Sequence, residues 1–570
     1  MASDDDDLAE STIADDDLPP KWTTCRANGC IGVSLGSDGK CLAHIDEAAR
    51  ESVLVRLRDG RAFDFARGVR FTESLLAEVL DALRDGEGRS RLGRADFRRA
   101  TFEDASFDGA IFENDVHFSE VTFEGGASFD DATFESLASF YAATFGGDAS
   151  FYRATFKSDV YFNGAKIEED ADFYGATFEG DAIFGGAIIG KATTFDEAVF
   201  LRARDFGPIL SSRLNLDRAT FFEAINIRMS GLRLSAVETT FARGARLRMR
   251  GVEIVLDGAD FGGPSILDAS PAPWHTAAEE GFLRWRRRLA VLHSHDALDE
   301  DAGSEVDELK SNPSEQPRLL SVRDANLGSL RLSGVDLMQT RFVGARGLAE
   351  LRIEGETTFG HAPPDWRWVG WRWPLVRAWA SRRTIAEEHY WRFRKQKHDG
   401  WYGREYRPRW FYGDPTISDP EQLEPHQIAT LYRALRKGRE DIGDQPGAAD
   451  FYYGEMEMRR HDGSASLAER ITLWLYWLVS GYGLRGSRAL VSLLITVFVF
   501  ATLLYVSGFR SHEGFGRALT FSADSTTSLL RVPEQPPLTL AGEWMQIGLR
   551  LLGPLFFGLA LLSLRGRVKR

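Results

Sequence analysis

The sequence is poor in cysteine, and its first residues lack the features of a secreted protein. Only three cysteines occur among 570 residues, all of them before residue 45, so a disulfide framework is not indicated. The chain begins Met-Ala-Ser and continues with four aspartates, without a basic stretch or an apolar core. Such a start excludes a secretory signal peptide, and we expect the bulk of the chain to remain in the cytoplasm.

Clustered positive charge is also lacking. Asp and Glu number 84 against 69 Lys and Arg, which gives a formal net charge of -15. Because binding to nucleic-acid phosphates needs grouped Lys and Arg, nucleic acid is not expected as the main partner. A chain of this length is too long for one ordinary core, so several domains are expected.

The sequence motifs of common enzymes are absent. It has no Walker loop, no Gly-x-Ser-x-Gly elbow and no His-Glu-x-x-His. His293 and His295 lie beside Asp296, but no nucleophile accompanies them in the sequence. We therefore expect no enzymatic activity and assign no catalytic residues.

What the sequence does contain is a regular spacing of phenylalanine, which occurs 39 times. Aromatic residues recur every five positions from Phe97 to Phe112, and the spacing then alternates between six and five as far as Phe206. Ile167 and Ile189 take two of these positions, and alanine often lies two residues before them. A helix would repeat its apolar residues every 3.6 positions and a strand every two, so neither explains the pattern.

A five-residue unit with one large and one small apolar side chain fits a square coil. Each side of the square turns its large residue to the axis, and coils stack by backbone pairing at roughly 4.8 Å. Residues 95–99 (Ala-Asp-Phe-Arg-Arg) and 325–329 (Ala-Asn-Leu-Gly-Ser) resemble the units of the pentapeptide-repeat family. The resemblance implies a mainly β fold, a right-handed quadrilateral β-helix. The six-residue spacings suggest an extra residue on two opposite sides of each coil.

The predicted solenoid is acidic. Residues 96–206 contain 22 Asp and Glu against 8 Lys and Arg. Some members of the family resemble DNA in shape and charge and bind type II topoisomerases, which is one interpretation of this acidity. The other is that a β-helix must cover its outer surface with polar groups to stay soluble.

The three cysteines and one histidine form a candidate metal site near the N-terminus. Cys25, Cys30, Cys41 and His44 have the spacing C-x4-C-x10-C-x2-H. Zinc takes four such ligands in a tetrahedron, and a closed set of four would make the site structural rather than catalytic. The alternative is three unrelated reduced cysteines.

The C-terminal part contains long apolar segments. Residues 489–509 form an uncharged segment long enough to span a membrane, and residues 540–564 form a second that contains Glu543 and Arg550. Residues 471–482 are apolar but too short to span, and are predicted to lie in the interface or to pack on neighbouring helices. Basic residues before the first span and after the second place both termini in the cytoplasm, in a multi-pass protein of the inner (plasma) membrane.

Residues 487–567 resemble the two-helix pore module of potassium channels. Residues 518–522 resemble the pore helix, and Thr526 and Thr527 lie where that family has its threonine pair. The family continues with Gly-Tyr-Gly-Asp, whereas this chain continues with Ser528-Leu-Leu-Arg531. The resemblance therefore implies a degenerate filter, because non-glycine residues do not readily adopt that backbone and Arg531 would repel a cation. An intramembrane charge such as Arg550, with Glu543 as a candidate partner, indicates a functional site. The alternatives are a side chain that snorkels to the membrane surface and a helix–helix contact in an oligomer.

These patterns predict eight segments. They are an acidic disordered tail (1–20), a zinc-knuckle-like segment (21–46), a helical cap (47–93), the β-helix (94–263), an insertion (264–317), a second repeat block (318–360), a Trp/Arg-rich helical membrane-proximal region (361–470) and the two-helix membrane module (471–570). The insertion is interpreted as a loop on the solenoid or as a docking element.

The function expected from this organisation is that of a membrane-anchored scaffold whose solenoid binds partner proteins. Membrane lipid is a further expected partner, and a homo-oligomer through the spanning helices is possible on this pattern. The alternative is an ion-channel-like oligomer whose cytoplasmic solenoid regulates it.

Overall fold

The computed structural model describes residues 22–35, 37–60, 66–274, 316–362, 366–368, 376–378, 382–395, 423–511, 513–527 and 537–568. The chain divides into two compact units, which are described separately. The solenoid unit runs to Asp336 and adds Gly344–Arg346 and Glu354–Thr357. The helical unit comprises Leu337–Val343, Gly347–Ile353 and the chain from Thr358 onward.

The solenoid unit begins with two helices, α1 (Glu47–Gly60) and α2 (Glu73–Ala82). Thr72 caps α2, because its side chain accepts a hydrogen bond from the backbone N–H of Leu75. The buried face of α2 contacts strand β1 (Arg70–Phe71) and strand β5 (Ala105–Ser106) of the first coils. An apolar helix face thus covers residues near the start of the stack.

Short parallel strands form the sides of the coils. One nine-stranded sheet holds β2 (Arg91–Leu92), β6 (Ile111–Phe112), β10 (Thr133–Phe134), β14 (Thr155–Phe156), β18 (Thr177–Phe178), β21 (Val199–Phe200), β23 (Thr220–Phe221), β25 (Thr240–Phe241) and β28 (Asp260–Phe261). A five-stranded sheet holds β3 (Ala95–Asp96), β7 (Val116–His117), β11 (Ala138–Ser139), β15 (Val160–Tyr161) and β19 (Ala182–Ile183).

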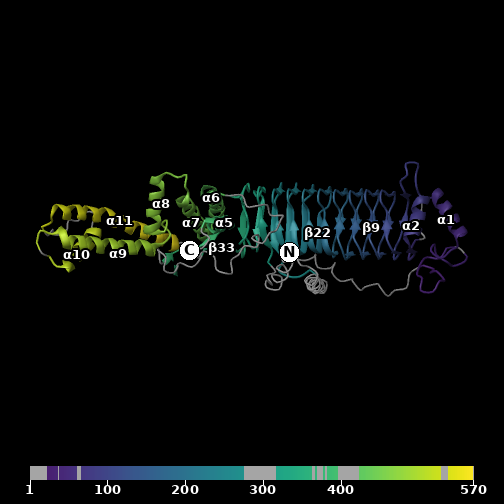
Figure 1. Cartoon of the computed structure of the whole chain (residues 1–570), viewed down its shortest axis with the longest axis horizontal. Coiled ribbons are helices and arrows are strands. Elements are labelled where there is room, and N and C mark those ends of the chain that lie inside the picture. The colour runs from purple at the N-terminus through teal and green to yellow at the C-terminus, as the bar shows by residue number, and fades with distance from the viewer. Residues whose placement is uncertain are drawn as a thin grey trace, which may run out of the picture. The chain divides into compact units, whose positions relative to one another are not determined.

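The third and largest sheet has 18 strands. Its strands are β1, β4 (Thr101–Phe102), β5 (Ala105–Ser106), β8 (Thr122–Phe123), β9 (Ala127–Ser128), β12 (Thr144–Phe145), β13 (Ala149–Ser150), β16 (Lys166–Ile167), β17 (Ala171–Asp172), β20 (Ile188–Thr194), β22 (Asp205–Asn215), β24 (Ile225–Ser235), β26 (Ala245–Arg250), β27 (Glu253–Val255), β29 (Ser265–Ala269), β30 (Arg318–Ser321), β31 (Leu330–Ser333) and β32 (Arg352–Glu354). Figure 1 shows the coils of the solenoid unit stacked one after another.

The register gives the length of a coil. Phe134 pairs with Phe112 on one side and with Phe156 on the other, so one coil takes 22 residues, or two of the eleven-residue periods. After Phe206 the coil shortens, since Phe221 pairs with Phe241 and Phe241 with Phe261. In this part β22 and β24 are single strands of 11 residues, and their pairing shifts by a bulge between Phe206 and Ile209.

The core of the solenoid unit is a set of stacked rings. Phe151 stacks on Phe129 and Phe173 in the coils before and after it, with ring centroids 4.9 and 4.8 Å apart. It also meets Phe140 edge-on at 5.4 Å. These are the separations at which aromatic pairs attract beyond simple burial. The prediction of a mainly β solenoid built from these repeats is confirmed as a parallel β-solenoid.

The second repeat block continues the same stack. Strand β30 pairs with β27, and β31 pairs with β29, although more than 40 residues of sequence separate them. The chain therefore resumes the coil after residues 275–315, which lie outside the described residues together with the predicted tail 1–20.

The helical unit contains two small antiparallel ladders followed by helices. The ladders pair β33 (Gly360–His361) with β36 (Arg383–Thr384) and β34 (Trp366–Trp368) with β35 (Val376–Ala378). The helices are α5 (Ala386–Lys395), α6 (Pro425–Asp441), α7 (Gln445–His461), α8 (Leu467–Ser480), α9 (Gly486–Leu503, extended by a π-helical turn Leu504–Gly508), α10 (Phe515–Thr527) and α11 (Leu540–Val568).

Among the described residues, one helix is long and apolar enough to cross a membrane by length and composition, the 23-residue segment Gly486–Gly508. It contains most of the first predicted span. The second predicted span falls in α11, where the side chains beyond residue 561 lie outside the described set. A second crossing, and with it a multi-pass topology, stays a prediction.

Candidate functional site

The four predicted metal ligands come together. The sulfur atoms and ring nitrogens of Cys25, Cys30, Cys41 and His44 all lie within 4.8 Å of one another. Cys41 Sγ is 3.2 Å from His44 Nδ1 and 3.7 Å from Cys30 Sγ, and Cys25 Sγ is 3.6 Å from His44 Nδ1. A cluster of three thiols and one imidazole at these separations can hold a metal ion.

Tight turns position these ligands. The backbone N–H of Ala27 lies 3.4 Å from the sulfur of Cys25, and the backbone N–H of Gly32 lies 3.4 Å from the sulfur of Cys30. In both cases the cysteine comes two residues earlier in the chain. Position 32 requires glycine because its backbone lies close to Cys41, and a Cβ there would lie 2.9 Å from the Cβ of Cys41. The glycine-rich spacing of the segment therefore serves the packing of the cluster.

The chemistry of this donor set suits a soft or borderline divalent cation. Burial raises the pKa of the Cys41 thiol to about 12, so the apoprotein would keep this thiol protonated. A bound cation would supply the positive charge that thiolates need. Four protein ligands would fill a tetrahedral shell and leave no position for a substrate.

The residues predicted to resemble a pore lie on α10 and beyond it. Thr526 is buried, and its hydroxyl donates to the carbonyl of Ser522 at 2.8 Å. Thr527 is the last residue of α10, whereas Ser528 and Arg531 lie outside the described residues. The structure therefore describes the helix that was predicted to resemble a pore helix, but not the segment that was predicted to correspond to a filter.

Helix α10 packs between α9 and α11. The hydroxyl of Ser522 donates to the carbonyl of Val497 in the middle of α9 at 2.9 Å. A Cβ on Gly553, in the middle of α11, would lie 2.4 Å from the carbonyl oxygen of Thr526. The last turn of α10 thus ends about halfway along both long helices.

The two long helices run antiparallel at close range. A Cβ on Gly542 near the start of α11 would lie 2.2 Å from the carbonyl oxygen of Gly508 at the end of α9. Leu504, Phe521 and Leu549 form a buried cluster between the three helices. Small residues at such crossings allow backbones to approach, as in helix pairs packed within membranes.

Glu543 and Arg550 lie on the same helix. Glu543 is exposed in the first turn of α11, and Arg550 is half-buried two turns later. Two guanidinium nitrogens of Arg550, Nε and Nη2, are buried without a hydrogen-bond partner among the described residues. Within the described part of the chain, Arg550 and Glu543 do not form an ion pair.

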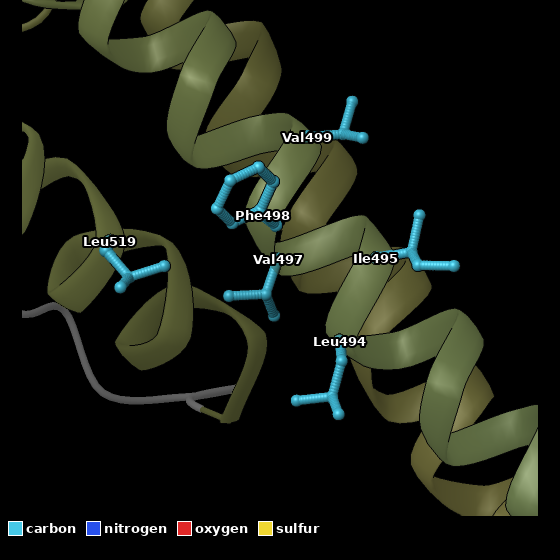
Figure 2. Close-up of a pocket in the computed structure, with 6 residues that line it drawn as sticks. All are labelled: Leu494, Ile495, Val497, Phe498, Val499 and Leu519. Atoms are coloured by element: carbon cyan, nitrogen blue, oxygen red, sulfur yellow. The ribbon is translucent and has the colours of Figure 1, made fainter.

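An open hollow lies on the surface of α9 and α10. It has a volume of about 410 Å³ and is lined by Leu494, Ile495, Val497, Phe498, Val499 and Leu519. Figure 2 shows Leu519 of α10 opposite the side chains of α9. All six lining side chains are hydrocarbon, so this hollow lacks the polar groups that orient a substrate.

The helical unit also contains buried charge, which was not predicted from the sequence. Glu388 is completely buried, and both its carboxylate oxygens accept from Nη2 of Arg382, at 2.6 and 2.5 Å. Arg392 Nε donates to the same carboxylate at 2.7 Å, and the hydroxyl of Tyr432 donates at 2.6 Å. Burial alone would raise the pKa of Glu388, but the two guanidinium groups lower it to about 2.

A second buried carboxylate extends this network toward α9. Glu457 of α7 accepts from Arg392 at 3.2 Å, from Arg460 at 2.7 Å and from the hydroxyl of Tyr482 at 3.1 Å. Tyr482 lies in the turn between α8 and α9. The network of Arg382, Glu388, Arg392, Glu457 and Tyr482 therefore joins β36, α5, α7 and the turn that precedes the membrane-length helix.

One signal in the sequence could have revealed part of this network. Glu388 and Arg392 are four residues apart, the spacing of an ion pair along a helix. Other partners are distant in sequence: Tyr432 on α6 is 44 residues from Glu388, and Glu457 on α7 is 65 residues from Arg392. Sequence spacing carries no information on such contacts.

Comparison with known proteins supports the interpretation of the repeats. The profile of a family described as pentapeptide repeats (9 copies) matches residues 88–133, 118–166, 140–188 and 151–199. No curated protein and no solved structure gives a significant match to the chain. The matched residues coincide with the regular coils β2 to β21. Residues 88–199 thus match the model of pentapeptide repeats, and they form coils of a parallel β-solenoid.

Proposed function

We propose that the protein is a membrane-anchored scaffold whose solenoid unit binds partner proteins. The observation that carries this proposal is the filled core of the solenoid. Its inward positions are occupied by stacked rings at centroid distances near 4.8 Å, which leaves the outer surface as the part available to ligands. Solenoids present extended surfaces of this kind to other proteins. The proposal assigns no catalytic role to the chain.

The outer surface offers features suited to protein contacts. Tyr152 and Tyr174 stack on each other at 5.4 Å on the outside of neighbouring coils, and Tyr141 is half-exposed on another side. Exposed tyrosines are frequent anchors of protein interfaces. The repeats that carry these tyrosines, residues 96–206, contain 22 Asp and Glu against 8 Lys and Arg, which favours a partner with a basic contact surface over nucleic acid.

The membrane anchor is supported by the exposed side chains of α9. Leu494, Phe498 and Val506 are all more than half exposed, and Val506 reaches 75 %. A patch of this size is costly in water but is expected for a helix surrounded by lipid. The basic residues Arg485 and Arg488 immediately before the apolar stretch support the proposal that this end of α9 is on the cytoplasmic side of the inner membrane.

Alkaline extraction of cell membranes tests the anchor. The full chain is expected to stay in the pellet, and a variant that ends at residue 464 is expected in the supernatant. Recovery of the full chain in the supernatant would refute anchoring. The truncated variant serves as the control, because it keeps the solenoid and α5–α7 but lacks every apolar helix after them.

Photo-crosslinking in cells tests partner binding. A photoreactive amino acid at Tyr152 is expected to give a discrete adduct with a second protein. The same group at Ile442, an exposed position at the end of α6, serves as the control and is expected to give none. If positions on every side of the solenoid behave like Ile442, the scaffold proposal fails.

We propose zinc as the ion of the Cys25, Cys30, Cys41 and His44 cluster, in a structural role. Three sulfurs and one ring nitrogen within 4.8 Å favour zinc over calcium or magnesium, which prefer oxygen ligands. Metal analysis of protein purified without a tag is expected to give about one zinc per chain. A Cys41→Ser variant is expected to lose the metal, whereas Ser34→Ala, in the same segment, is expected to retain it.

A second candidate function is an oligomeric ion channel, and the position of α10 favours it. A short helix that ends halfway along two antiparallel helices is the arrangement of a two-helix pore module. Ion flux through purified protein in liposomes tests this alternative. Cation conduction predicts higher flux for Arg531→Gly than for the natural chain, and no flux from either inserted protein would leave the helices as an anchor.

A further inference from the structure

Helix α8 has two different faces. On one face, Leu473, Tyr476 and Trp477 pack against a cluster that includes Tyr453 and Met456 of α7. The indole N–H of Trp477 donates to the hydroxyl of Tyr453 at 3.1 Å. This face fixes α8 to the helical unit.

The opposite face of α8 is an exposed apolar stripe. It consists of Leu467, Ile471, Trp474, Leu475 and Leu478, which are between 47 and 73 % exposed. Their spacing places them on one side of the helix, about half a turn away from the packed face. With 14 residues α8 is too short to cross a bilayer, so this stripe needs another apolar surrounding.

The turn after α8 determines how α8 is directed relative to α9. Gly481, Tyr482 and Gly483 all have left-handed backbones, with φ of 53°, 58° and 77°, and α9 begins at Gly486. Three such residues in succession bend the chain sharply. Figure 1 shows α8 lying across the line of α9, with α7 on one side of α8 and α9 to α11 extending from the other. Because the apolar stripe lies opposite the face that packs on α7, it faces the side toward which α9 runs.

We propose that α8 lies in the plane of the lipid–water interface, with its apolar stripe among the upper acyl chains of a phospholipid membrane. This inference rests on the proposed anchoring by α9. If α9 stands along the membrane normal, a helix that crosses its cytoplasmic end lies parallel to the membrane surface. The stripe then meets lipid rather than water.

The side chains around the stripe fit a lipid surface better than a second protein chain. Trp474 lies within the stripe, and Trp477 lies at its edge beneath the guanidinium group of Arg488, 5.5 Å from the ring centroid. Tryptophan and arginine together are typical of the headgroup level, where an amphipathic helix buries its apolar face. The exposed hydrocarbon of α9 begins at Leu490, a short distance along the chain from the end of the stripe at Leu478.

Fluorescence quenching by brominated lipid tests the position of α8. Full-length protein is reconstituted in phosphatidylcholine vesicles with or without bromine on the upper acyl carbons. The emission of Trp474 is obtained as the difference between the natural chain and Trp474→Phe. We expect this emission to fall roughly twofold or more in brominated vesicles, because the ring lies at the depth of the quencher. The matched difference for Trp477→Phe is expected to fall less, since Trp477 packs against α7.

A charge on the stripe provides a second test. Leu475→Asp combined with Leu478→Asp is expected to shift the Trp474 emission to longer wavelength and to reduce its quenching by lipid. Thr472→Asp, exposed on the same helix but outside the stripe, is the control and is expected to change neither.

Three results would overturn the inference. Trp474 could be quenched by aqueous iodide and not by brominated lipid, which would place the stripe in water. It could be protected from both quenchers, which would mean that protein covers it. Finally, the emission and lipid quenching of Trp474 could change equally in the Leu475→Asp, Leu478→Asp variant and in the Thr472→Asp control. Alkaline extraction separates these results from failure of the anchor, since retention in the pellet with an unquenched Trp474 contradicts only the position of α8.

Discussion

The solenoid unit and the helical unit fill their interiors in different ways. In the solenoid, Phe151 contacts other rings in its own coil and in the coils on either side. In the helical unit, the carboxylates of Glu388 and Glu457 are buried among arginines and tyrosine hydroxyls. Hydrocarbon packing tolerates local loss because each coil depends only on its neighbours. A buried ionic network does not, because removing one charge leaves its partners unpaired.

The largest expected effect comes from breaking the network at Glu388. Glu388→Gln keeps the shape of the side chain but leaves Arg382 and Arg392 without their shared counter-charge. We expect the free energy of unfolding of the helical unit to fall by about 3–5 kcal/mol. Denaturation of the protein in detergent, followed by circular dichroism at the helical minimum, measures this change.

A surface ion pair of the same type is the control for Glu388. Glu440 pairs with Arg436 at 3.4 Å on α6, and its side chain is 49 % exposed. Glu440→Gln is expected to cost less than about 1 kcal/mol. Equal effects of the two substitutions would contradict the view that the buried charges depend on one another.

The next effect tests the solenoid at the centre of its ring stack. Phe151→Ala removes contacts to Phe129, Phe173 and Phe140, and is expected to cost about 3 kcal/mol through the cavity that it leaves. The loss should be local. Hydrogen exchange is expected to speed up in the coils that contain residues 129–173 and to stay unchanged in the helical unit.

Tyr152→Ala is the matched control for Phe151→Ala, because Tyr152 is the next residue but points outward and is 37 % exposed. Its effect on stability is expected to stay within about 0.5 kcal/mol. If Phe151→Ala accelerated exchange throughout both units, the proposed independence of the coils would be wrong.

The two units also differ in how far the sequence predicts them. The spacing of phenylalanine predicted the coils, because each inward position repeats and periodicity survives in one dimension. The cluster of Cys25, Cys30, Cys41 and His44 was predicted for a similar reason, since its ligands are close in sequence. The long strands β22 and β24 were not predicted, because the register changes where the spacing becomes irregular. The pairing of Arg382 with Tyr432 depends on the fold of the chain between them, which spacing does not report.

The apolar C-terminal helices were predicted from the sequence only in part. A run of apolar residues predicted α9, because hydropathy is local. The packing of α10 between α9 and α11 depends on Ser522 and Gly553, whose roles become visible only when the three helices are side by side.

A pH titration sharpens the comparison through Glu387, whose neighbour Glu388 is held charged. Glu387 is buried, and one of its carboxylate oxygens accepts from the backbone N–H of Phe342. Burial raises the pKa of Glu387 from 4.5 to about 7. Between these two values the folded state binds a proton that the unfolded state releases, so stability falls as pH rises through this window.

Glu387 is therefore expected to contribute a loss of stability from about pH 5 to about pH 7, whereas buried His389, whose pKa is lowered from 6.5 to about 4, contributes a gain of stability as pH rises between those two values. Denaturation at each pH separates the two contributions: Glu387→Gln is expected to remove the loss due to Glu387, whereas Glu440→Gln, on the surface of the same unit, is expected to leave it. The pKa of Glu388 is lowered, so its contribution has the opposite sign and is lost only as pH falls from about 4.5 to about 2. The same dependence of stability on pH in the natural chain and in Glu387→Gln would contradict the role given to Glu387.

The smallest effect concerns the corners of the solenoid. Ala142 and Gly164 occupy the same corner in successive coils, since Ser139 pairs with Tyr161, and their φ angles are 52° and 66°. An alanine in this left-handed region is strained, whereas glycine is not. A Cβ on Gly164 would meet no atom within 4 Å, so substitution there changes the backbone energy without a steric clash.

This pair separates backbone strain from packing in a way that the ring stack cannot. Ala142→Gly is expected to stabilise the solenoid by about 0.5 kcal/mol, because relief of strain exceeds the added entropy of the unfolded chain. Gly164→Ala is expected to destabilise it by about 0.5–1 kcal/mol, and the double variant should lie near the natural chain. Denaturation followed at the β-sheet minimum measures all three. Effects of the same sign would show that contacts between coils, rather than the left-handed backbone, determine which residue a corner accepts.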